Sequence, residues 1–414
     1  MSRRFAGALV VLVVAVSGWA GGSSESETPS FADRFPSLAW DGVVEEARGS
    51  DLYWYMWGGS ESTNRFVQEY VAARLTEDFE IDLRMVPVTD ASVYVSKVLG
   101  ERQAGRTRGG SVDLVWINGE NFRSMREADL LFGPYANRLP NIQYVDTDDP
   151  SVANDFGFPV DDYESPYGSA QFVMVYDSAR VAPPDSVDQL LAWIRKNPGR
   201  FTYPAPPDFT GSAFVRHIFY HVAGSYEELL GPFSQELFDS VAPDVWRLLN
   251  DLEPYLWRSG STYPETLTQQ QQFFANGEID FDMGYNPAGA ANLVNQGRYP
   301  ASTRTFVFEE GTIGNTHYVA IPFNAANTAA ALVAANLLLE PAVQFEKARP
   351  EVWGDLPVVA LSRLPEEWQR RFAAIQRPES VLPQIVLQEH RIPELQSRWL
   401  QAIEQGWIEN VLVK

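Results

Sequence analysis

The chain has 414 residues and no cysteine, which excludes disulfide bonds, thiolate metal sites and a cysteine nucleophile. Its formal net charge of -22 at pH 7 would repel phosphate backbones and anionic membrane surfaces, so nucleic-acid binding is not expected. With 45% hydrophobic and 13% aromatic residues, the chain has enough apolar material for two lobes, each with its own core.

The amino terminus has the layout of an export signal. Arg3 and Arg4 precede an apolar run at 6–16, and small residues follow as far as Ala20. This run is far shorter than the roughly 20 residues that cross a bilayer, and a polar segment follows it. We therefore expect a signal peptide at 1–20, cleaved near Ala20, and a mature protein in the periplasm. An uncleaved anchor is the alternative.

After a leader at 21–47, the sequence alternates between strand and helix patterns. Short apolar runs that end at a loop predict strands at 52–57, 81–88 and 112–117. Apolar residues at helical spacing behind capping residues predict helices at 64–79, 93–103 and 122–128. This alternation is typical of a parallel sheet with helices on both faces.

A second set of elements follows an irregular stretch at 133–168. Apolar runs predict strands at 172–176, 201–203 and 279–283. Helical spacing predicts helices at 187–196, 211–222, 244–255 and 267–276. A strand at 314–321 would carry the chain back to the first set, and an Ala/Leu-rich helix is expected at 328–339. Peripheral helices are expected at 366–375 and 394–407.

The predicted fold class is therefore α/β with two lobes, each a mainly parallel sheet flanked by helices, joined by hinge strands. The first part of lobe 1 is expected at 48–168 and lobe 2 at 169–311. Residues 312–414 would return to lobe 1 and end in the C-terminal helices.

Two strand-to-helix loops of the first set are candidate binding loops, because ligands of open α/β sheets bind beyond the carboxyl ends of strands. In the first loop, Gly58 and Gly59 would let a ligand approach the backbone, and Trp57 offers a flat face to a ring or a cation. A tight turn beside a core tryptophan is the alternative. Another loop carries more polar groups than a plain connection requires, at Trp116, Asn118, Glu120 and Asn121.

The second set contributes further candidates. A proline-rich approach leads to a helix start whose free N–H groups can hold a polar or anionic atom, at Thr210, Gly211 and Ser212. Asp208, just before them, could hold a positive centre, and an ordinary helix cap is the alternative. The remaining candidates follow a strand or lie at the expected crossover between lobes: Asp282, Tyr285, Asn286 and Glu164. For Asp282 a buried capping role is equally open.

The sequence lacks the signatures of several enzyme classes: the G-x-S-x-G elbow, the Walker A loop, G-x-G-x-x-G and H-E-x-x-H. His217 and His221 lie four residues apart and could share a metal ion, but no third ligand has an evident spacing. We interpret them as part of a helix face beside a core, and we expect no metal or cofactor. Acidic residues are abundant, so an exported glycan hydrolase stays an alternative.

Several segments resemble the YnjB-type substrate-binding proteins of ABC importers, relatives of thiamine- and iron-binding receptors with the type II periplasmic-binding fold. The resemblance covers nearly all of the mature chain and is carried by residues 109–123, 202–204, 206–211, 254–258, 285–288, 311–315 and 352–355. It implies a two-lobed receptor that closes on a small solute. It also implies a membrane permease and an ATPase as partners.

The relatives also suggest the kind of solute. Iron-binding relatives use an adjacent tyrosine pair, and no Tyr-Tyr occurs in this sequence, which argues against ferric iron. Thiamine-binding relatives use aromatic stacking with carboxylates, for which the candidates are Trp57, Trp116, Tyr285, Glu120, Asp208 and Asp282. We therefore expect a monomeric, non-catalytic receptor for a cationic heteroaromatic such as thiamine. A sugar is the alternative, because it also stacks on tryptophan.

Overall fold

The computed structural model describes residues 30–413. The expected signal peptide at 1–20 and its cleavage near Ala20 lie outside the described residues. The chain divides into a short unit, Met1–Ser37, and a main unit, Leu38–Lys414. The described part of the short unit contains α1 (Phe31–Arg34), which Ser30 caps by accepting a hydrogen bond from the Asp33 N–H. The fold and the site described below belong to the main unit.

The larger of two main sheets has six strands among the described residues: β1 (Asp51–Trp57), β2 (Asp82–Val88), β3 (Leu114–Ile117), β6 (Glu164–Gln171), β10 (Thr312–Ala320) and β11 (Arg391–Ile392). β1 pairs in parallel with β2 and β3. β10 runs antiparallel to β3 and β6 and parallel to β11. The expected parallel arrangement thus holds for the first three strands, and the returning strand runs in the opposite direction.

The smaller sheet is formed, among the described residues, by β7 (Val173–Asp177), β8 (Phe281–Gly284) and β9 (Thr303–Phe306). Both of its pairings are antiparallel, so the expectation of a mainly parallel sheet is wrong for this lobe. β8 starts beside the end of β7, with Tyr176 opposite Phe281, and therefore runs back along it. A short hairpin of β4 (Asn154–Asp155) and β5 (Phe158–Pro159) stands apart from both sheets.

Helices accompany both sheets. The helices that precede β6 in the main unit are α2 (Trp40–Ala47), α3 (Glu61–Arg65), α4 (Ala72–Phe79), α5 (Ser92–Gln103), α6 (Glu120–Glu127) and α7 (Pro150–Ala153). A π-helical stretch at Phe66–Val71 joins α3 to α4. After β10 follow α13 (Thr328–Leu338), α14 (Pro341–Ala348), α15 (Glu366–Ala373) and α16 (Gln384–Glu389). The smaller sheet is accompanied by α8 (Val187–Lys196), α9 (Phe209–Ala223), α10 (Gln235–Leu252), α11 (Leu267–Ala275), α12 (Gly289–Asn295) and α17 (Ser397–Trp407).

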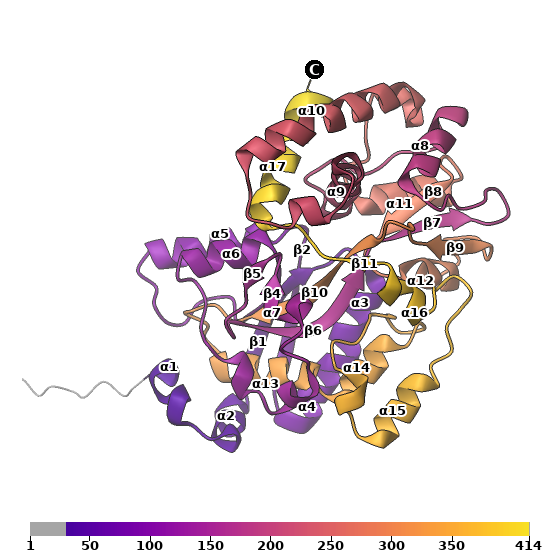
Figure 1. Cartoon of the computed structure of the whole chain (residues 1–414). Helices are drawn as coiled ribbons and strands as arrows, with labels where there is room; N and C mark the ends of the chain where they lie inside the picture. Colours follow the sequence, from indigo (N-terminus) through magenta and orange to yellow (C-terminus); the bar gives the residue numbers. More distant parts are fainter. Residues whose placement is uncertain (1–29, 414) are drawn as a thin grey trace, which may run out of the picture. The chain divides into compact units, whose positions relative to one another are not determined.

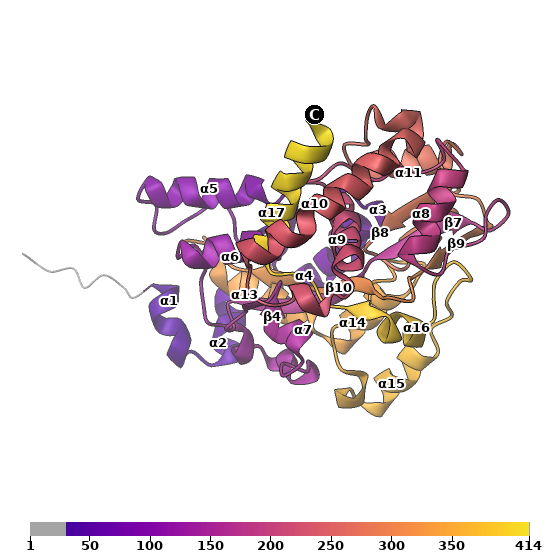
Figure 2. The same ribbon diagram turned by 45° about the horizontal axis from the view of Figure 1, so that its top comes forward.

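The C-terminal helix α17 belongs to the core of the smaller lobe. Its buried residues Trp399, Ile403 and Trp407 recur every fourth position and pack into the cluster that holds Phe214 and Phe281. Figure 1 and Figure 2 both show α17, in yellow, beside α10. The expectation of a peripheral helix at 394–407 is therefore wrong, because one apolar face of this helix completes a core.

Three segments of the described chain cross between the two lobes. The first is Phe172, between β6 and β7, and the second is 307–311, between β9 and β10. The third is 393–396, which leads from β11 to α17. The lobe boundaries at 169 and 312 stay a prediction.

Two expectations fail for local reasons. No strand forms at 201–203, because the carbonyl groups there bond elsewhere: Phe201 O accepts from the Trp257 N–H at 2.8 Å, and Thr202 O from Gln270 Nε2 at 2.9 Å. In contrast, the stretch at 133–168, expected to be irregular, ends in β6. β6 is buried along its whole length and contains Pro166, so it shows no alternation of polar and apolar residues.

Within residues 30–413, no single helix is long and apolar enough to cross a membrane. The pair α13 and α14 passes that test together by length and composition, but the two helices are bent by 63°.

Candidate functional site

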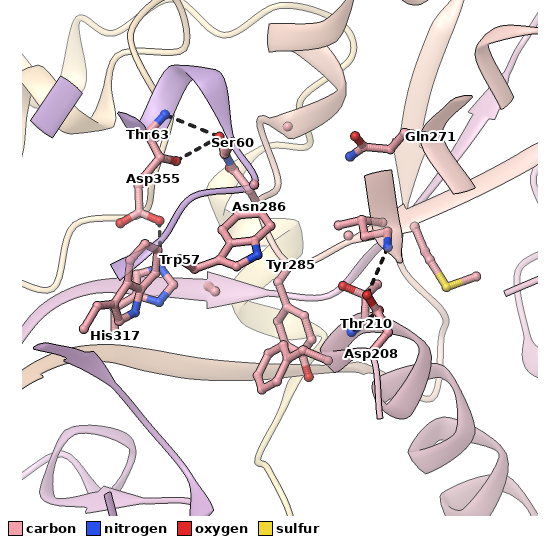
Figure 3. A pocket seen from close by; sticks show the side chains of 18 of the residues that line it. Trp57, Ser60, Thr63, Asp208, Thr210, Gln271, Tyr285, Asn286, His317 and Asp355 are labelled. Atoms are coloured by element: carbon pink, nitrogen blue, oxygen red, sulfur yellow. Dashed lines mark hydrogen bonds and ion pairs between the residues drawn. The ribbon is translucent and has the colours of Figure 1, made fainter. Parts of the chain in front are cut away.

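A cavity of about 360 Å³ lies between the two lobes. The larger lobe lines it with residues that follow β1, β2 and β3, and the smaller lobe with β7, β8 and residues that start α9 and α12. Figure 3 shows Tyr285 between a side with His317 and Asp355 and a side with Asp208 and Thr210. Small-molecule sites in proteins typically have volumes of roughly 300–1,000 Å³. We call this cavity the cleft.

Most of the residues selected from the sequence line the cleft: Trp57, Gly59, Trp116, Asn118, Glu120, Asn121, Asp208, Thr210, Asp282, Tyr285 and Asn286. They come from four segments that are far apart in the sequence. The structure brings these loops together because each follows a strand that ends at the cleft or starts a helix there.

Four selected residues are not among the lining residues: Gly58, Gly211, Ser212 and Glu164. The Gly58 N–H donates to Val88 O at 3.1 Å. A Cβ at Gly211 would lie 1.9 Å from Pro204 O, so close backbone packing explains this glycine. The Ser212 hydroxyl is buried and accepts a hydrogen bond from Arg216 Nη1 at 2.9 Å.

Glu164 is fully buried on β6, and neither of its carboxyl oxygens has a hydrogen-bond partner among the described residues. Burial, together with the nearby Asp155 carboxyl, raises the pKa of Glu164 well above its usual range. Asp155 is also buried, and its Oδ2 accepts the Gly119 N–H at 2.6 Å just before α6. Through this bond Asp155 supports the loop that carries Glu120, and neither Asp155 nor Glu164 lines the cleft.

Replacing Glu164 by glutamine is expected to flatten the pH dependence of stability. The unfolded carboxyl ionises near its ordinary pKa of about 4.3, whereas the folded one ionises at higher pH. Between these values the folded state binds the extra proton, so Glu164 makes the wild type lose stability as pH rises. Thermal unfolding between pH 4 and 8 should show the variant gaining stability relative to the wild type as pH rises. Parallel curves would contradict this assignment.

One wall of the cleft is an aromatic cluster around Trp116, which stands at the end of β3. Its ring centroid lies 5.1 Å from that of His317, 5.6 Å from Tyr167 and 6.1 Å from Trp353. The rings of His317 and Trp353 stack at 6.2 Å with an interplanar angle of 15°. Trp116, His317 and Trp353 line the cleft, and the buried Tyr167 packs against them. His317 and Trp353 were not predicted from the loop pattern, because they come from segments far along the chain.

Trp57 stands at the end of β1, the strand that pairs with β3, and is 40% exposed. A Cβ at Gly59 would lie 2.2 Å from Cζ2 of the Trp57 indole, so the indole lies directly over the Gly59 backbone. Gly59 has no unusual φ, and its role is to leave room for this ring. Gly59 also lines the cleft, and the expected approach of a ligand to its backbone stays a prediction.

The acidic lining residues differ in how many hydrogen bonds and ion pairs the protein itself makes to their carboxyl oxygens. Asp208 caps α9 with Oδ1, which accepts the N–H groups of Thr210 and Gly211 at 3.0 Å each. Its Oδ2 accepts the Leu267 N–H at 3.0 Å. Burial nevertheless raises the pKa of Asp208. The capping role, which the sequence left open, therefore occupies both oxygens.

Asp355 is neutralised within the protein. It is buried, its Oδ2 lies 2.7 Å from Lys347 Nζ, and its Oδ1 lies 3.0 Å from His317 Nε2. Burial raises the pKa of Asp355, but the charges of Lys347 and His317 outweigh burial and hold that pKa below its usual value.

Asp282 has one carboxyl oxygen that remains able to accept a hydrogen bond from a solute. Its Oδ2 accepts a hydrogen bond from the Tyr299 hydroxyl at 2.5 Å, and no described residue makes a well-formed hydrogen bond to Oδ1. Asp282 is only 1% exposed, and burial raises its pKa to about 7. Glu404 on α17, which the sequence reading missed, also lines the cleft, and burial raises its pKa to about 7.

The lining residues are unbalanced in charge. The carboxyl groups belong to Glu61, Asp90, Glu120, Asp208, Asp282, Asp355 and Glu404. Among the lining residues of the described chain, Arg298 is the only lysine or arginine. Even with Asp208 used as a cap and Asp355 paired, the cleft offers several carboxyl groups to a positively charged solute.

The histidine pair of the sequence reading is not a shared metal site. His217 is buried, with Nδ1 2.8 Å from Ala213 O and Nε2 accepting the Ile313 N–H at 3.1 Å. Burial lowers its pKa to about 3. His221 instead lies 3.3 Å from Asp188. Within residues 30–413, no group of three or more His, Asp or Glu residues is placed to hold a metal ion.

Comparison with known proteins identifies the family. The family described as bacterial extracellular solute-binding protein matches residues 70–374. The chain is also 38% identical over 370 residues to protein YnjB of Escherichia coli (strain K12), covering 89% of this chain and 93% of YnjB. The chain belongs to the bacterial extracellular solute-binding protein family.

Solved structures of solute-binding proteins share the fold. The spermidine/putrescine ABC transporter substrate-binding protein PotD of Streptococcus pneumoniae matches with a TM-score of 0.62 at 15% identity, covering 88% of this chain and 99% of PotD. A periplasmic thiamin binding protein matches with a TM-score of 0.57 at 16% identity, covering 87% and 96%. At these identities the likeness concerns the fold, and it confirms the expected two-lobed α/β class for this family member.

Proposed function

We propose that this chain is the solute receptor of an ABC importer and captures a small organic cation in the cleft. The observation that carries the proposal is the excess of carboxyl groups over cationic groups in a cleft with aromatic walls. Family membership supports a receptor role. Two proteins of the same fold are named for cationic or polyamine solutes, which fits the same chemistry. Delivery would be to a membrane permease and its ATPase, from a monomer in the periplasm.

A cationic heteroaromatic such as thiamine is the proposed solute. Trp57 and Tyr285 would offer ring faces, and Asp282, Glu120 and Glu404 would supply the opposite charge. A micromolar dissociation constant corresponds to about 8 kcal/mol at standard state, which stacking and several satisfied hydrogen bonds can supply. This set needs no metal or cofactor.

Cation binding is expected to strengthen as pH rises through about 7. Asp282 and Glu404 have pKa values of about 7, so below that pH a proton occupies the group that should face the cation. Each proton released on binding makes the affinity change by up to about tenfold per pH unit below the pKa. Isothermal titration with thiamine from pH 5.5 to 8.5 measures this slope. An affinity that is flat or falls with rising pH would count against carboxylate recognition.

Replacing Gly59 by alanine should weaken solute binding with little effect on folding. The added Cβ would displace the Trp57 indole, which is 40% exposed and so can shift without disturbing a buried core. A cation–π contact contributes about 0.5–2 kcal/mol, so the affinity should fall roughly 2- to 30-fold. Gly100→Ala on α5 is the matched control, because its Cβ would meet no atom within 4 Å. Equal affinities in the two variants would show that Trp57 does not contact the solute.

A thermal-shift screen tests the proposed function directly. A solute at 100 times its dissociation constant adds roughly 2.7 kcal/mol to stability. Organic cations such as thiamine should raise the melting temperature, whereas neutral sugars should have little effect. Stabilisation by sugars alone would favour a sugar receptor of the same class.

The raised carboxyl pKa values in the cleft also suit an acid catalyst, which keeps a glycan hydrolase as the second candidate. Incubation of the protein with glycans separates the two classes. A receptor leaves the glycan intact, and release of a product would overturn the receptor assignment.

A further inference from the structure

We propose that Arg216 and Glu394 are positioning residues that hold Tyr285 in the cleft and couple its position to the rotation of the two lobes. The inference rests on the proposed function, because it assigns the Tyr285 ring to solute contact. It adds a route by which solute contact is transmitted to the segments that connect the lobes.

Arg216 and Glu394 form a buried ion pair beneath the cleft. Arg216 lies on α9 of the smaller lobe, and Glu394 lies on the third crossover, at 393–396. Nε of Arg216 is 3.2 Å from Glu394 Oε2, and Nη2 donates to Oε1 at 3.3 Å. Both side chains are almost completely buried, so each charge depends on the other for compensation.

Tyr285 is attached to this pair through its hydroxyl group. The hydroxyl donates to Glu394 Oε1 at 2.6 Å and accepts a hydrogen bond from Arg216 Nη2 at 2.8 Å. The Tyr285 ring lines the cleft, with its centroid 4.8 Å from that of Phe209. At its other end, Tyr285 O accepts the Gln171 N–H at 3.0 Å, next to the first crossover. The residue therefore joins the cleft to two crossovers.

The neighbouring part of α9 contacts the remaining crossover. His217, next to Arg216, packs on Phe308 of the second crossover, with ring centroids 6.2 Å apart, and its Nε2 accepts the N–H of Ile313 just after that crossover. The ring centroid of His217 also lies 4.6 Å from that of Phe172, the first crossover. Two adjacent residues of one helix thus contact all three segments that connect the lobes of the described chain.

The larger lobe contacts the same network through Asn315 on β10. Asn315 Nδ2 donates to Glu394 Oε1 at 3.3 Å, and Asn315 also lines the cleft. A rotation of one lobe against the other would move Asn315 relative to Arg216 and Tyr285. Because a buried ion pair tolerates little loss of its partners, the network favours one lobe arrangement. A solute packed on Tyr285 would stabilise that arrangement.

The test uses Tyr285→Phe, which keeps the ring and removes the hydroxyl, and Glu394→Gln, which keeps the shape and removes the charge. Tyr176→Phe on β7 is the matched control, because its ring packs on Phe306 away from the cleft-lining set. Thiamine is the probe, with affinity from isothermal titration and compaction from small-angle X-ray scattering. Hydrogen exchange at 171–173 and 311–313 is measured without any solute.

We expect each variant to bind thiamine at least tenfold more weakly and to lose most of the solute-induced compaction. The double variant should bind thiamine no more weakly than the weaker-binding single variant, because both changes break the same link. Exchange at the crossovers should rise about tenfold in both variants and stay unchanged in the control. Normal compaction in Tyr285→Phe, or additive losses, would overturn the inference.

The two proposals fail in different ways. If the wild type does not respond to thiamine, the proposed solute fails, and the exchange data alone decide the inference. Unchanged exchange at 171–173 and 311–313 in both variants would then overturn it.

Discussion

Replacing Lys347 by methionine is expected to lower the free energy of unfolding by about 3–5 kcal/mol. Lys347 is buried on α14, and its ammonium group donates to Asp355 Oδ2 at 2.7 Å and to the backbone carbonyl of Tyr167. Removing it leaves the buried Asp355 carboxylate with His317 as its remaining partner. The packing is tight here, since a Cβ at Gly168 would lie 2.2 Å from Asp355 Oδ2.

Denaturant unfolding at neutral pH measures the loss. The double variant Lys347→Met with Asp355→Leu should recover most of the stability, because no unpaired charge remains buried. Lys196→Met, on the exposed end of α8, should change stability by less than about 0.5 kcal/mol. The effect of Lys347→Met should shrink in acid, since the pKa of Asp355 is lowered and its contribution disappears as pH falls through that value. A loss below about 1 kcal/mol would contradict the pairing.

Replacing Asp282 by asparagine is the second large expected effect, and it concerns binding. The buried carboxylate has one oxygen with no well-formed partner among the described residues, and the substitution keeps the size of the side chain. Truncating one partner of a buried charge pair costs about 2–5 kcal/mol, so cation affinity should fall at least roughly 30-fold. Binding of a neutral sugar should change by less than about threefold, because it needs no counter-charge.

Asp208→Asn is the matched control for this prediction. Asp208 also lines the cleft, but both of its oxygens already accept backbone N–H groups. Its replacement should lower stability by about 1 kcal/mol, as for other helix caps, and leave the preference for cations unchanged. Equal losses of cation and sugar binding in Asp282→Asn, measured by isothermal titration, would reject the cationic solute.

The sequence identified most cleft loops because of a general property of α/β sheets. Strand ends of a sheet meet at one edge, so Trp57 and Trp116 could be placed near each other without coordinates. The helix at 187–196 coincides with α8, where Ser186 accepts the Gln189 N–H as a cap. Local patterns of this kind depend on neighbours in the chain, and such neighbours are visible in the sequence.

The missed elements depend on distant partners. β6 carries Glu164, Ser165 and Pro166, and it forms a strand only because β10 pairs along its length. His317 and Glu404 reach the cleft because β10 and α17 return there late in the chain. For Trp353 and Asp355 a signal was present, because 352–355 was one of the segments that carried the family resemblance. That signal did not indicate that Trp353 and Asp355 would lie in the cleft.

The central claim is that the cleft binds an organic cation and leaves it unchanged, and one titration tests it most directly. Purified protein is titrated with thiamine and, separately, with glucose at pH 8, and the recovered solute is analysed by mass spectrometry. We expect saturable binding of one thiamine per chain, a dissociation constant in the micromolar range, and intact thiamine after recovery. Binding of glucose without thiamine, or recovery of a cleaved solute, would contradict the claim.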